Sequence, residues 1–143
     1  MTKPLAIGVA GLGTVGAGVL TLLRDNAATV AARAGRPVAV TAVSSRDRTK
    51  DRGVSLSGLR WYEDAPALAH DSNVDVVVET IGGTEGPAAA LVRAAIAAGK
   101  PVVTANKALL AVHGAEIAAQ AEAKGVPLGF EAAVAGGIPA IKA

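Results

Sequence analysis

The sequence predicts an α/β protein, a doubly wound and mostly parallel sheet with helices on both faces. Two observations carry this prediction. Short apolar runs alternate along the chain with segments that have the apolar spacing of helices, which is typical of parallel strands joined by crossover helices. The first apolar run, residues 4–10, leads directly into the pattern Gly11-x-Gly13-x-x-Gly16 and then into a helical stripe.

This glycine pattern is typical of a turn that binds a dinucleotide. The first glycine permits the tight turn, the second lets the backbone approach a pyrophosphate, and the third lets the helix pack closely on the strand. Free N–H groups and the helix dipole favour a phosphate at that point. A tight turn without a ligand is the alternative, but strand, glycines and helix follow in the order that a Rossmann-type domain requires.

Composition sets limits on the class of protein. The chain has 143 residues, of which 51% are hydrophobic and only 2% aromatic, so small aliphatic side chains must fill a one-domain core. The net charge is +2 without a basic block, which gives nucleic-acid binding little support. Without cysteine there is no thiol nucleophile or thiolate metal site. No apolar run approaches the roughly 20 residues of a membrane span or resembles a signal peptide, so we expect a cytoplasmic protein.

The helices and strands are predicted from the apolar runs and from the proline and glycine residues that bound them. Runs that are apolar almost throughout indicate buried parallel strands, Pro87 suits a first helical turn, and Gly99 and Gly125 suit helix ends. The polar stretch from Ser44 to Gly58 has no apolar period and is predicted to be a loop. We predict strands at 4–10, 38–43, 60–62, 74–80, 101–104 and 126–130, and helices from 14 to about 32, at 63–70, from 87 to 99, and up to 125.

In such a sheet the ligand lies beyond the carboxyl ends of the strands. The second strand is followed by Ser44-Ser45-Arg46-Asp47. Serines and an arginine would suit the 2′-phosphate of NADP, whereas Asp47 keeps NAD possible. A solvated charge run is an equally good interpretation of this stretch.

Three further strand ends carry candidate groups. Gly82-Gly83 is either a flexible turn or, as we favour, a place where the backbone approaches the nicotinamide half of a cofactor. Lys107 follows a strand at a helix start, where a cation is unfavourable, and this suggests a ligand contact. Glu79 is either buried and paired or faces the ligand, and the sequence leaves both possibilities open.

Four segments resemble the N-terminal part of the homoserine dehydrogenase family, in the form not fused to an aspartokinase. They are Gly-Leu-Gly-Thr-Val-Gly at 11–16, Asp-Val-Val-Val-Glu-Thr-Ile-Gly-Gly at 75–83, Val-Val-Thr-Ala-Asn-Lys-Ala-Leu-Leu-Ala at 102–111 and Phe-Glu-Ala-Ala-Val-Ala-Gly-Gly-Ile-Pro at 130–139. The last two are more specific than the first, and the resemblance covers essentially the whole chain.

The resemblance implies an NAD(P)-dependent oxidoreductase that interconverts L-aspartate 4-semialdehyde and L-homoserine in threonine and methionine biosynthesis. It implies a catalytic role for Lys107, which would contact cofactor and substrate. The implied cofactor-binding residues are Gly11, Gly13, Thr14, Val15 and Gly16 at the pyrophosphate, Ser45 and Arg46 at the ribose, and Thr80, Ile81 and Gly82 near the nicotinamide.

The resemblance also implies a monovalent cation, sodium, on the segment after the last strand. A carboxylate and backbone carbonyls are hard oxygen ligands that suit such an ion, although a simple interdomain hinge would also fit this segment. The implied ligands are Glu131, Val134, Gly136 and Ile138.

The family's second catalytic lysine, most substrate-binding residues and dimerisation sheet would lie beyond Ala143. We therefore expect residues 1–130 to form the dinucleotide-binding domain, and 131–143 to form the cation loop and the start of a helix leading to a catalytic domain absent from this chain. We expect the chain to bind cofactor with little or no turnover. The full-length protein is expected to form a homodimer or larger oligomer, with a small-molecule substrate and neither nucleic acid nor a membrane as partner.

Two alternatives of different classes remain. One is another two-domain reductase, of the sugar or dihydrodipicolinate type, although those families differ from Thr-Ala-Asn-Lys at 104–107. A thioester-forming aldehyde dehydrogenase would need a cysteine. The other alternative is a nucleotide-sensing regulatory module without chemistry, against which Lys107 and the cation loop argue.

Overall fold

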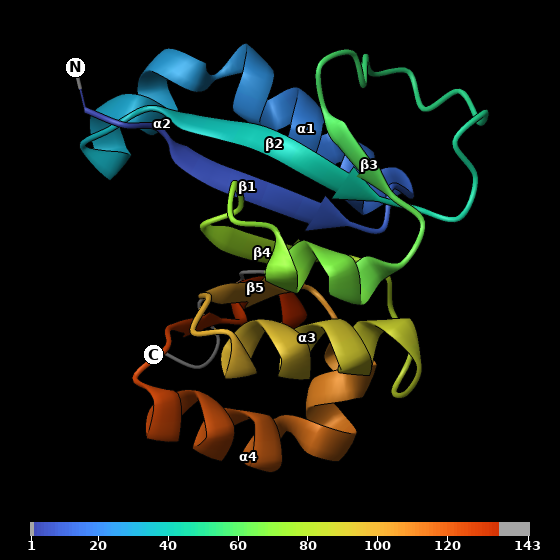
Figure 1. Cartoon of the computed structure of the whole chain (residues 1–143), viewed down its shortest axis with the longest axis vertical. Helices are drawn as coiled ribbons and strands as arrows, with labels where there is room; N and C mark the ends of the chain where they lie inside the picture. The colour runs from blue at the N-terminus through green and yellow to red at the C-terminus, as the bar shows by residue number, and fades with distance from the viewer. Residues whose placement is uncertain (1, 135–143) are drawn as a thin grey trace.

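The computed structural model describes residues 2–134, which form a six-stranded sheet in the order β3-β2-β1-β4-β5-β6. Every neighbouring pair of strands is parallel. This order is that of a doubly wound dinucleotide-binding sheet, so the predicted fold class is confirmed (Figure 1). The strands are β1 (Leu5–Ala10), β2 (Val38–Ser44), β3 (Arg60–Tyr62), β4 (Val76–Glu79), β5 (Val102–Thr104) and β6 (Leu128–Gly129).

Helices cover both faces of the sheet. In Figure 1, α1 and α2 lie beside β1 and β2 on one face, whereas α3 and α4 lie on the other face, beside β4 and β5. The first 3₁₀ helix, η1, packs against α3. The helices are α1 (Thr14–Asp25), α2 (Ala27–Ala34), η1 (Ala65–His70), α3 (Pro87–Ala97), α4 (Lys107–Lys124) and η2 (Glu131–Ala133).

Each face has its own core, and both consist mainly of aliphatic side chains, as the composition predicted. The core under η1, α3 and α4 includes the fully buried Leu68, Leu91, Leu109 and Ile117. The core on the α1 face consists of Ile7, Val9, Leu12, Leu20 and Val43. Because the two cores lie on either side of β1 and β4, β1 is buried on both faces and β4 is buried on one face and half-buried on the other, which explains their unbroken apolar sequence.

Some element boundaries differ from the prediction. The single helix expected over 14–32 is two helices, because Asn26 adopts φ −113° and ψ 22° and its side-chain amide donates to the Leu22 carbonyl at 3.1 Å. The strand expected over 74–80 begins later, at Val76, since the Asp75 carboxylate accepts a hydrogen bond from the Ala6 N–H at 2.9 Å. The last strand is limited to Leu128–Gly129.

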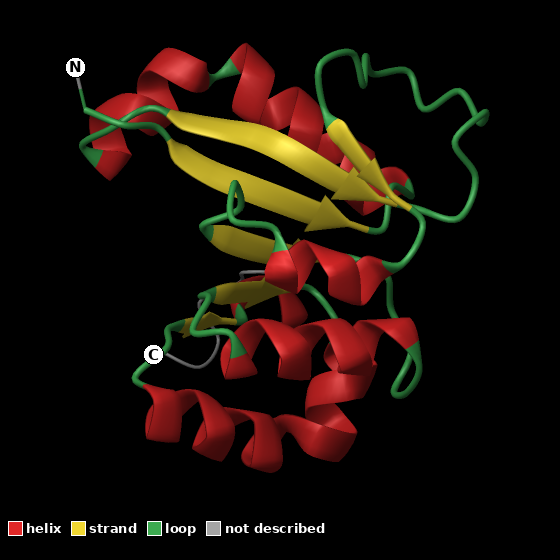
Figure 2. Ribbon diagram, in the orientation of Figure 1, coloured by secondary structure: helices red, strands yellow, loops and turns green. Residues whose placement is uncertain are grey.

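The carboxyl ends of the strands meet at one edge of the sheet, where a short glycine turn follows β1 and longer loops follow β2 and β4 (Figure 2). The longest of these loops is the predicted polar stretch after β2. Among residues 2–134 no helix combines the length and the apolar character needed to cross a bilayer.

Candidate functional site

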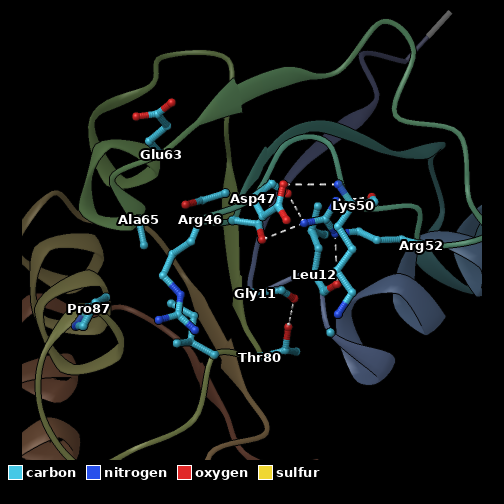
Figure 3. Close-up of a pocket in the computed structure, with 14 residues that line it drawn as sticks. Gly11, Leu12, Arg46, Asp47, Lys50, Arg52, Glu63, Ala65, Thr80 and Pro87 are labelled. Carbon is cyan, nitrogen blue, oxygen red and sulfur yellow. Dashed lines mark hydrogen bonds between the residues drawn. The ribbon is translucent and has the colours of Figure 1, made fainter.

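A cleft of 610 Å³ lies at the carboxyl ends of β1, β2 and β4 (Figure 3). The glycine turn after β1, the loop after β2, the start of η1 and the turn after β4 form its walls. Of the residues predicted for the site, the cleft is lined by Gly11, Gly13, Ser45, Arg46, Thr80 and Ile81. A smaller hollow of 240 Å³ continues along the glycine turn past Thr14.

The three glycines of the turn meet different surroundings. Gly11 has φ 89°, and a Cβ there would lie 2.7 Å from the Thr80 backbone. A Cβ on Gly16 would lie only 1.8 Å from the Gly11 carbonyl oxygen. A Cβ on Gly13, in contrast, would meet no atom within 4 Å. Close packing of the protein therefore requires glycine at 11 and 16, whereas the space at 13 opens into the cleft.

The start of α1 faces this open space. Gly13 is the N-cap of α1 and offers no side chain, so the first N–H groups of the helix, on Thr14 to Gly16, are left for another acceptor. Thr14 and Val15 are exposed. With the positive end of the helix dipole, these free N–H groups are able to bind an anion such as a phosphate.

Thr80, the residue that follows β4, holds the glycine turn in place. Its hydroxyl donates to the Gly11 carbonyl at 2.6 Å and lies 3.0 Å from the Ala10 carbonyl. Figure 3 shows this contact at the floor of the cleft. Thr80 lines the cleft, but its hydroxyl is bound to the protein's own backbone, so it fixes the glycine turn.

Cationic side chains gather where the cleft borders the loop after β2. Arg46 extends across the cleft toward the wall that contains Thr80 and Pro87 (Figure 3). Lys50 lines both the cleft and the smaller hollow beside Gly13. The Ser45 hydroxyl is held by the guanidinium of Arg52 at 3.0 Å.

Arg52, which the sequence analysis did not single out, binds this loop to the glycine turn. Its guanidinium donates to the carbonyls of Leu12 at 3.2 Å and Lys50 at 2.6 Å, and also to the Asp47 carbonyl. The guanidinium carbon stands 5.5 Å from the centre of the Trp61 ring. In the sequence, Arg52 is one of several charges in a loop without periodicity, and no spacing distinguishes it from Arg48.

Asp47 is used within the same loop. One of its carboxylate oxygens accepts from the Thr49 hydroxyl and N–H, both at 2.8 Å, and from the Lys50 N–H at 3.2 Å. The Thr49 hydroxyl and then its N–H are the main causes of a pKa of Asp47 below the usual aspartate value. Asp47 therefore closes a turn of the loop, as aspartates often do.

Glu79, for which the sequence left two possibilities, is buried and paired with protein groups. It is 0% exposed. One carboxylate oxygen accepts from the N–H groups of Ile81 at 2.7 Å and Gly82 at 3.1 Å, and the other accepts from the Thr104 hydroxyl at 2.6 Å. The carboxylate thus joins the turn after β4 to the end of β5.

Lys107 is the exposed first residue of α4 and is not among the residues that line the cleft. The preceding Asn106 caps the helix by accepting from the Leu109 N–H at 3.0 Å. The Asn106 amide also donates to the Gly83 carbonyl at 2.8 Å, which places the start of α4 next to the turn after β4. Lys107 and that turn therefore lie at the same edge of the sheet.

Comparison with known proteins agrees with this geometry. A family model described as "Homoserine dehydrogenase, NAD binding domain" matches residues 11–131, from the first glycine of the turn to the start of η2. The chain belongs to the homoserine dehydrogenase family. The matched part is the NAD-binding domain, and the resemblance stated from the sequence is confirmed.

Individual homoserine dehydrogenases resemble the chain in sequence and in structure. The chain is 49% identical over 141 residues to homoserine dehydrogenase of Pseudomonas aeruginosa. The aligned region covers 99% of this chain and 32% of that protein. With the Corynebacterium glutamicum enzyme it shares 50% identity over 139 residues, 95% of this chain and 31% of that protein. A crystal structure of a homoserine dehydrogenase from Thiobacillus denitrificans superposes with a TM-score of 0.89 at 51% identity, over 98% of this chain and 32% of that one. The chain thus spans about a third of the length of these relatives.

The segment predicted to bind a cation in homoserine dehydrogenase is described only in part. Glu131 is exposed at the start of η2, and Val134 follows that helix. Gly136 and Ile138 lie outside the described residues. Between residues 2 and 134, no three histidine, aspartate or glutamate side chains gather closely enough to hold a metal ion.

Proposed function

We propose that this chain is the cofactor-binding domain of an NAD(P)-dependent homoserine dehydrogenase, which interconverts L-aspartate 4-semialdehyde and L-homoserine. The observation that carries the proposal is the open space at Gly13, between two glycines that are closely packed and at the exposed start of α1. The backbone from Gly13 to Gly16 would hold the pyrophosphate there. The bound nicotinamide supplies or accepts the hydride, and the chain's own residues orient it.

We propose NADP as the preferred cofactor because of the groups on the adenosine side. Arg46, Lys50 and the Ser45 hydroxyl line the cleft, and together they suit a dianionic phosphate. An acid that binds an unphosphorylated ribose needs a free carboxylate oxygen in reach. One oxygen of Asp47 already accepts three hydrogen bonds from its own loop. The other oxygen of Asp47 accepts none of the hydrogen bonds found among the described residues, so the preference for a phosphate rests on the cationic Arg46 and Lys50 that line the cleft.

The nicotinamide half would lie against the turn after β4. Ile81 is 37% exposed and lines the cleft, so it offers apolar surface to a ring. Thr80 fixes the neighbouring glycine turn, and Gly82 leaves room for close approach of the cofactor. Lys107, at the same edge of the sheet, would provide an ammonium for a cofactor oxygen or a substrate oxygen.

Further parts of the proposal concern the rest of the protein. Substrate-binding residues and the main catalytic lysine would lie outside this chain, in a cytoplasmic homo-oligomer. A sodium ion would be held by the Glu131 carboxylate and by backbone carbonyls of Val134, Gly136 and Ile138. A carboxylate and a carbonyl are donors of the type that such an ion takes; Glu131 is exposed and its carboxylate is therefore accessible.

Calorimetric titration of the chain with NADPH and NADH tests the proposal directly. We expect NADPH to bind. Arg46→Ala should lower the affinity for NADPH by about tenfold or more, which is the usual effect of losing a hydrogen bond to a charged group. The NADH affinity should change little. Arg33→Ala removes an equal charge from the exposed end of α2 and serves as the control.

The outcomes separate the parts of the proposal. If folded wild-type chain binds neither cofactor, the glycine turn is structural and the proposed function fails. If both cofactors bind equally and Arg46→Ala weakens them equally, the chain binds a nicotinamide cofactor but the phosphate role of Arg46 is wrong.

A further inference from the structure

Glu79 is buried at a place where a charge is costly. Its side chain is fully enclosed, and within residues 2–134 no lysine, arginine or histidine forms a salt bridge with it. Burial of a carboxylate without a counter-charge is tolerated only when hydrogen bonds compensate. Here the three donors are two backbone N–H groups and a hydroxyl.

These donors belong to two loops that border the proposed nicotinamide position. Ile81 and Gly82 form the turn after β4, where Gly82 has φ 89°, and the N–H groups of both residues donate to one carboxylate oxygen of Glu79. Thr104 ends β5. Strand pairing alone already aligns Glu79 with Thr104, so the carboxylate acts mainly on the turn that leaves the sheet.

The hydrogen bonds continue from Thr104 into the start of α4. The Thr104 oxygen accepts from the Asn106 N–H at 3.0 Å, and the Asn106 amide donates back to the Gly83 carbonyl at 2.8 Å. Glu79, Thr104 and Asn106 thus close a ring of contacts around the turn. We call these three residues the β4–β5 network; all of them are buried.

We propose that Glu79 is a positioning residue for the nicotinamide half of the cofactor. Through the β4–β5 network it holds the backbone of Ile81 and Gly82 and the start of α4, with Lys107, in one fixed arrangement. Because Glu79 is enclosed, it touches neither cofactor nor substrate, and it acts by pre-organising the groups that do. The inference rests on the proposed function, since it assigns the nicotinamide to this turn.

The test compares the whole cofactor with its adenosine half. The wild-type chain is titrated with whichever reduced cofactor it binds more tightly and with the matching fragment, adenosine 2′,5′-bisphosphate for NADPH or AMP for NADH. Glu79→Gln keeps the size of the side chain but replaces an acceptor by a donor. We expect this variant to bind the whole cofactor about tenfold or more weakly than the wild type does. Its affinity for the fragment should stay within about twofold of the wild-type value.

Two further variants keep the test decisive. Thr104→Val removes the hydroxyl that donates to Glu79, keeps the shape of the side chain, and should lower the ratio of cofactor to fragment affinity in the same direction; it carries the test if Glu79→Gln does not fold. Asp71→Asn alters another buried carboxylate, which lies outside the cleft-lining residues. The ratio should be unchanged in Asp71→Asn even though the variant loses stability.

Each result has a defined meaning. If the ratio of cofactor affinity to fragment affinity is the same in Glu79→Gln and Thr104→Val as in the wild type, whether or not both affinities fall, the positioning role is overturned. The proposed function is then left intact. If the folded wild-type chain binds neither probe, the proposed function fails and the positioning role fails with it. A selective loss of whole-cofactor affinity that is absent in Asp71→Asn supports the role.

Discussion

Gly13 and Gly16 are three residues apart, yet the protein uses them for opposite purposes. The space beside Gly13 is open to the cleft, whereas Gly16 is pressed against the Gly11 carbonyl. Gly13 also has φ −77° and ψ −162°, which any residue can adopt. A side chain at position 13 would therefore obstruct a ligand, and one at position 16 would obstruct the fold.

Alanine at the two positions should separate binding from stability. Gly16→Ala should lower the free energy of unfolding by about 1–3 kcal/mol or more, because a Cβ there would overlap the Gly11 oxygen. Gly13→Ala should cost no more than about 1 kcal/mol of stability, the effect of alanine in place of glycine at an N-cap. It should weaken cofactor binding by about tenfold or more, a cost of about 1.4 kcal/mol. Denaturant unfolding followed by circular dichroism, and calorimetric titration, measure the two effects. Destabilisation by Gly13→Ala with normal binding would contradict this assignment.

At the scale of elements, one side chain, Arg52, connects the loop after β2 to the glycine turn. Arg52 donates to the backbone carbonyls of Asp47 and Lys50 and to the Leu12 carbonyl of the glycine turn. The loop has no strand or helix of its own between β2 and β3. Its cationic wall therefore depends on these side-chain contacts for its position.

We expect Arg52→Gln to lower the affinity for NADPH by about tenfold or more, since the contacts that hold the loop to the glycine turn are charge-assisted. Arg48→Gln is the matched control, because Arg48 is an exposed arginine of the same loop that does not line the cleft. It should change affinity by no more than about twofold, as expected for an exposed charge. Equal losses in the two calorimetric titrations would show that only the net charge of the loop matters.

The N-terminus of α4 gives a second element-scale prediction. Asn106→Ala removes both the cap and the bond to the Gly83 carbonyl, and should cost about 1–2 kcal/mol of unfolding free energy. Asn106→Ser retains a capping oxygen but lacks the amide, so it should recover part of this loss. Thermal unfolding of the two variants measures the difference. Identical stability would mean that capping by Asn106 contributes nothing.

Sequence reasoning found the elements better than the contacts between them. The strand at Leu5–Ala10, the glycine turn and the helix starting at Pro87 follow from local patterns, and so the fold class was predictable. The break at Asn26 was not, because apolar spacing continues past it. The partners of Glu79 and Arg52 are distant in the sequence or lie in an irregular loop, and no periodicity encodes such contacts. Only the folded backbone reveals them.

At the scale of the whole molecule, buried polar side chains connect separate elements away from the cleft as well as beside it. Asp71, after η1, accepts hydrogen bonds from the Asn73 N–H at 2.9 Å and the Tyr62 hydroxyl at 3.0 Å. Lys100 donates from the other side of this corner to the Asp71 and Val74 carbonyls. These contacts connect η1, β3 and the segment before β5, so they hold together parts of the chain that enter the sheet separately.

Asp71 makes stability depend on pH. Burial raises its pKa, but the hydrogen bonds from Asn73 and Tyr62 and the charge of Arg60 outweigh that effect, and the pKa is lowered overall. The stabilisation is therefore complete above the unfolded-state pKa, near 3.9, and is lost as the pH falls through the folded-state pKa. The difference in unfolding free energy between wild type and Asp71→Asn should be largest near neutral pH and shrink below about pH 4. A difference that stays constant from neutral to acidic pH would contradict this.

The contact between Arg52 and Trp61 has a practical consequence. Trp61 is the only tryptophan of the chain, and its ring lies under the guanidinium that borders the cleft. The chain thus contains a single tryptophan fluorophore, one side chain away from the proposed cofactor site. Indole emits where reduced nicotinamide absorbs, so bound NADPH should quench this emission by energy transfer, and NADP⁺ should affect it only through movement of the loop. An unlabelled sample can therefore report cofactor occupancy and loop order in one spectrum.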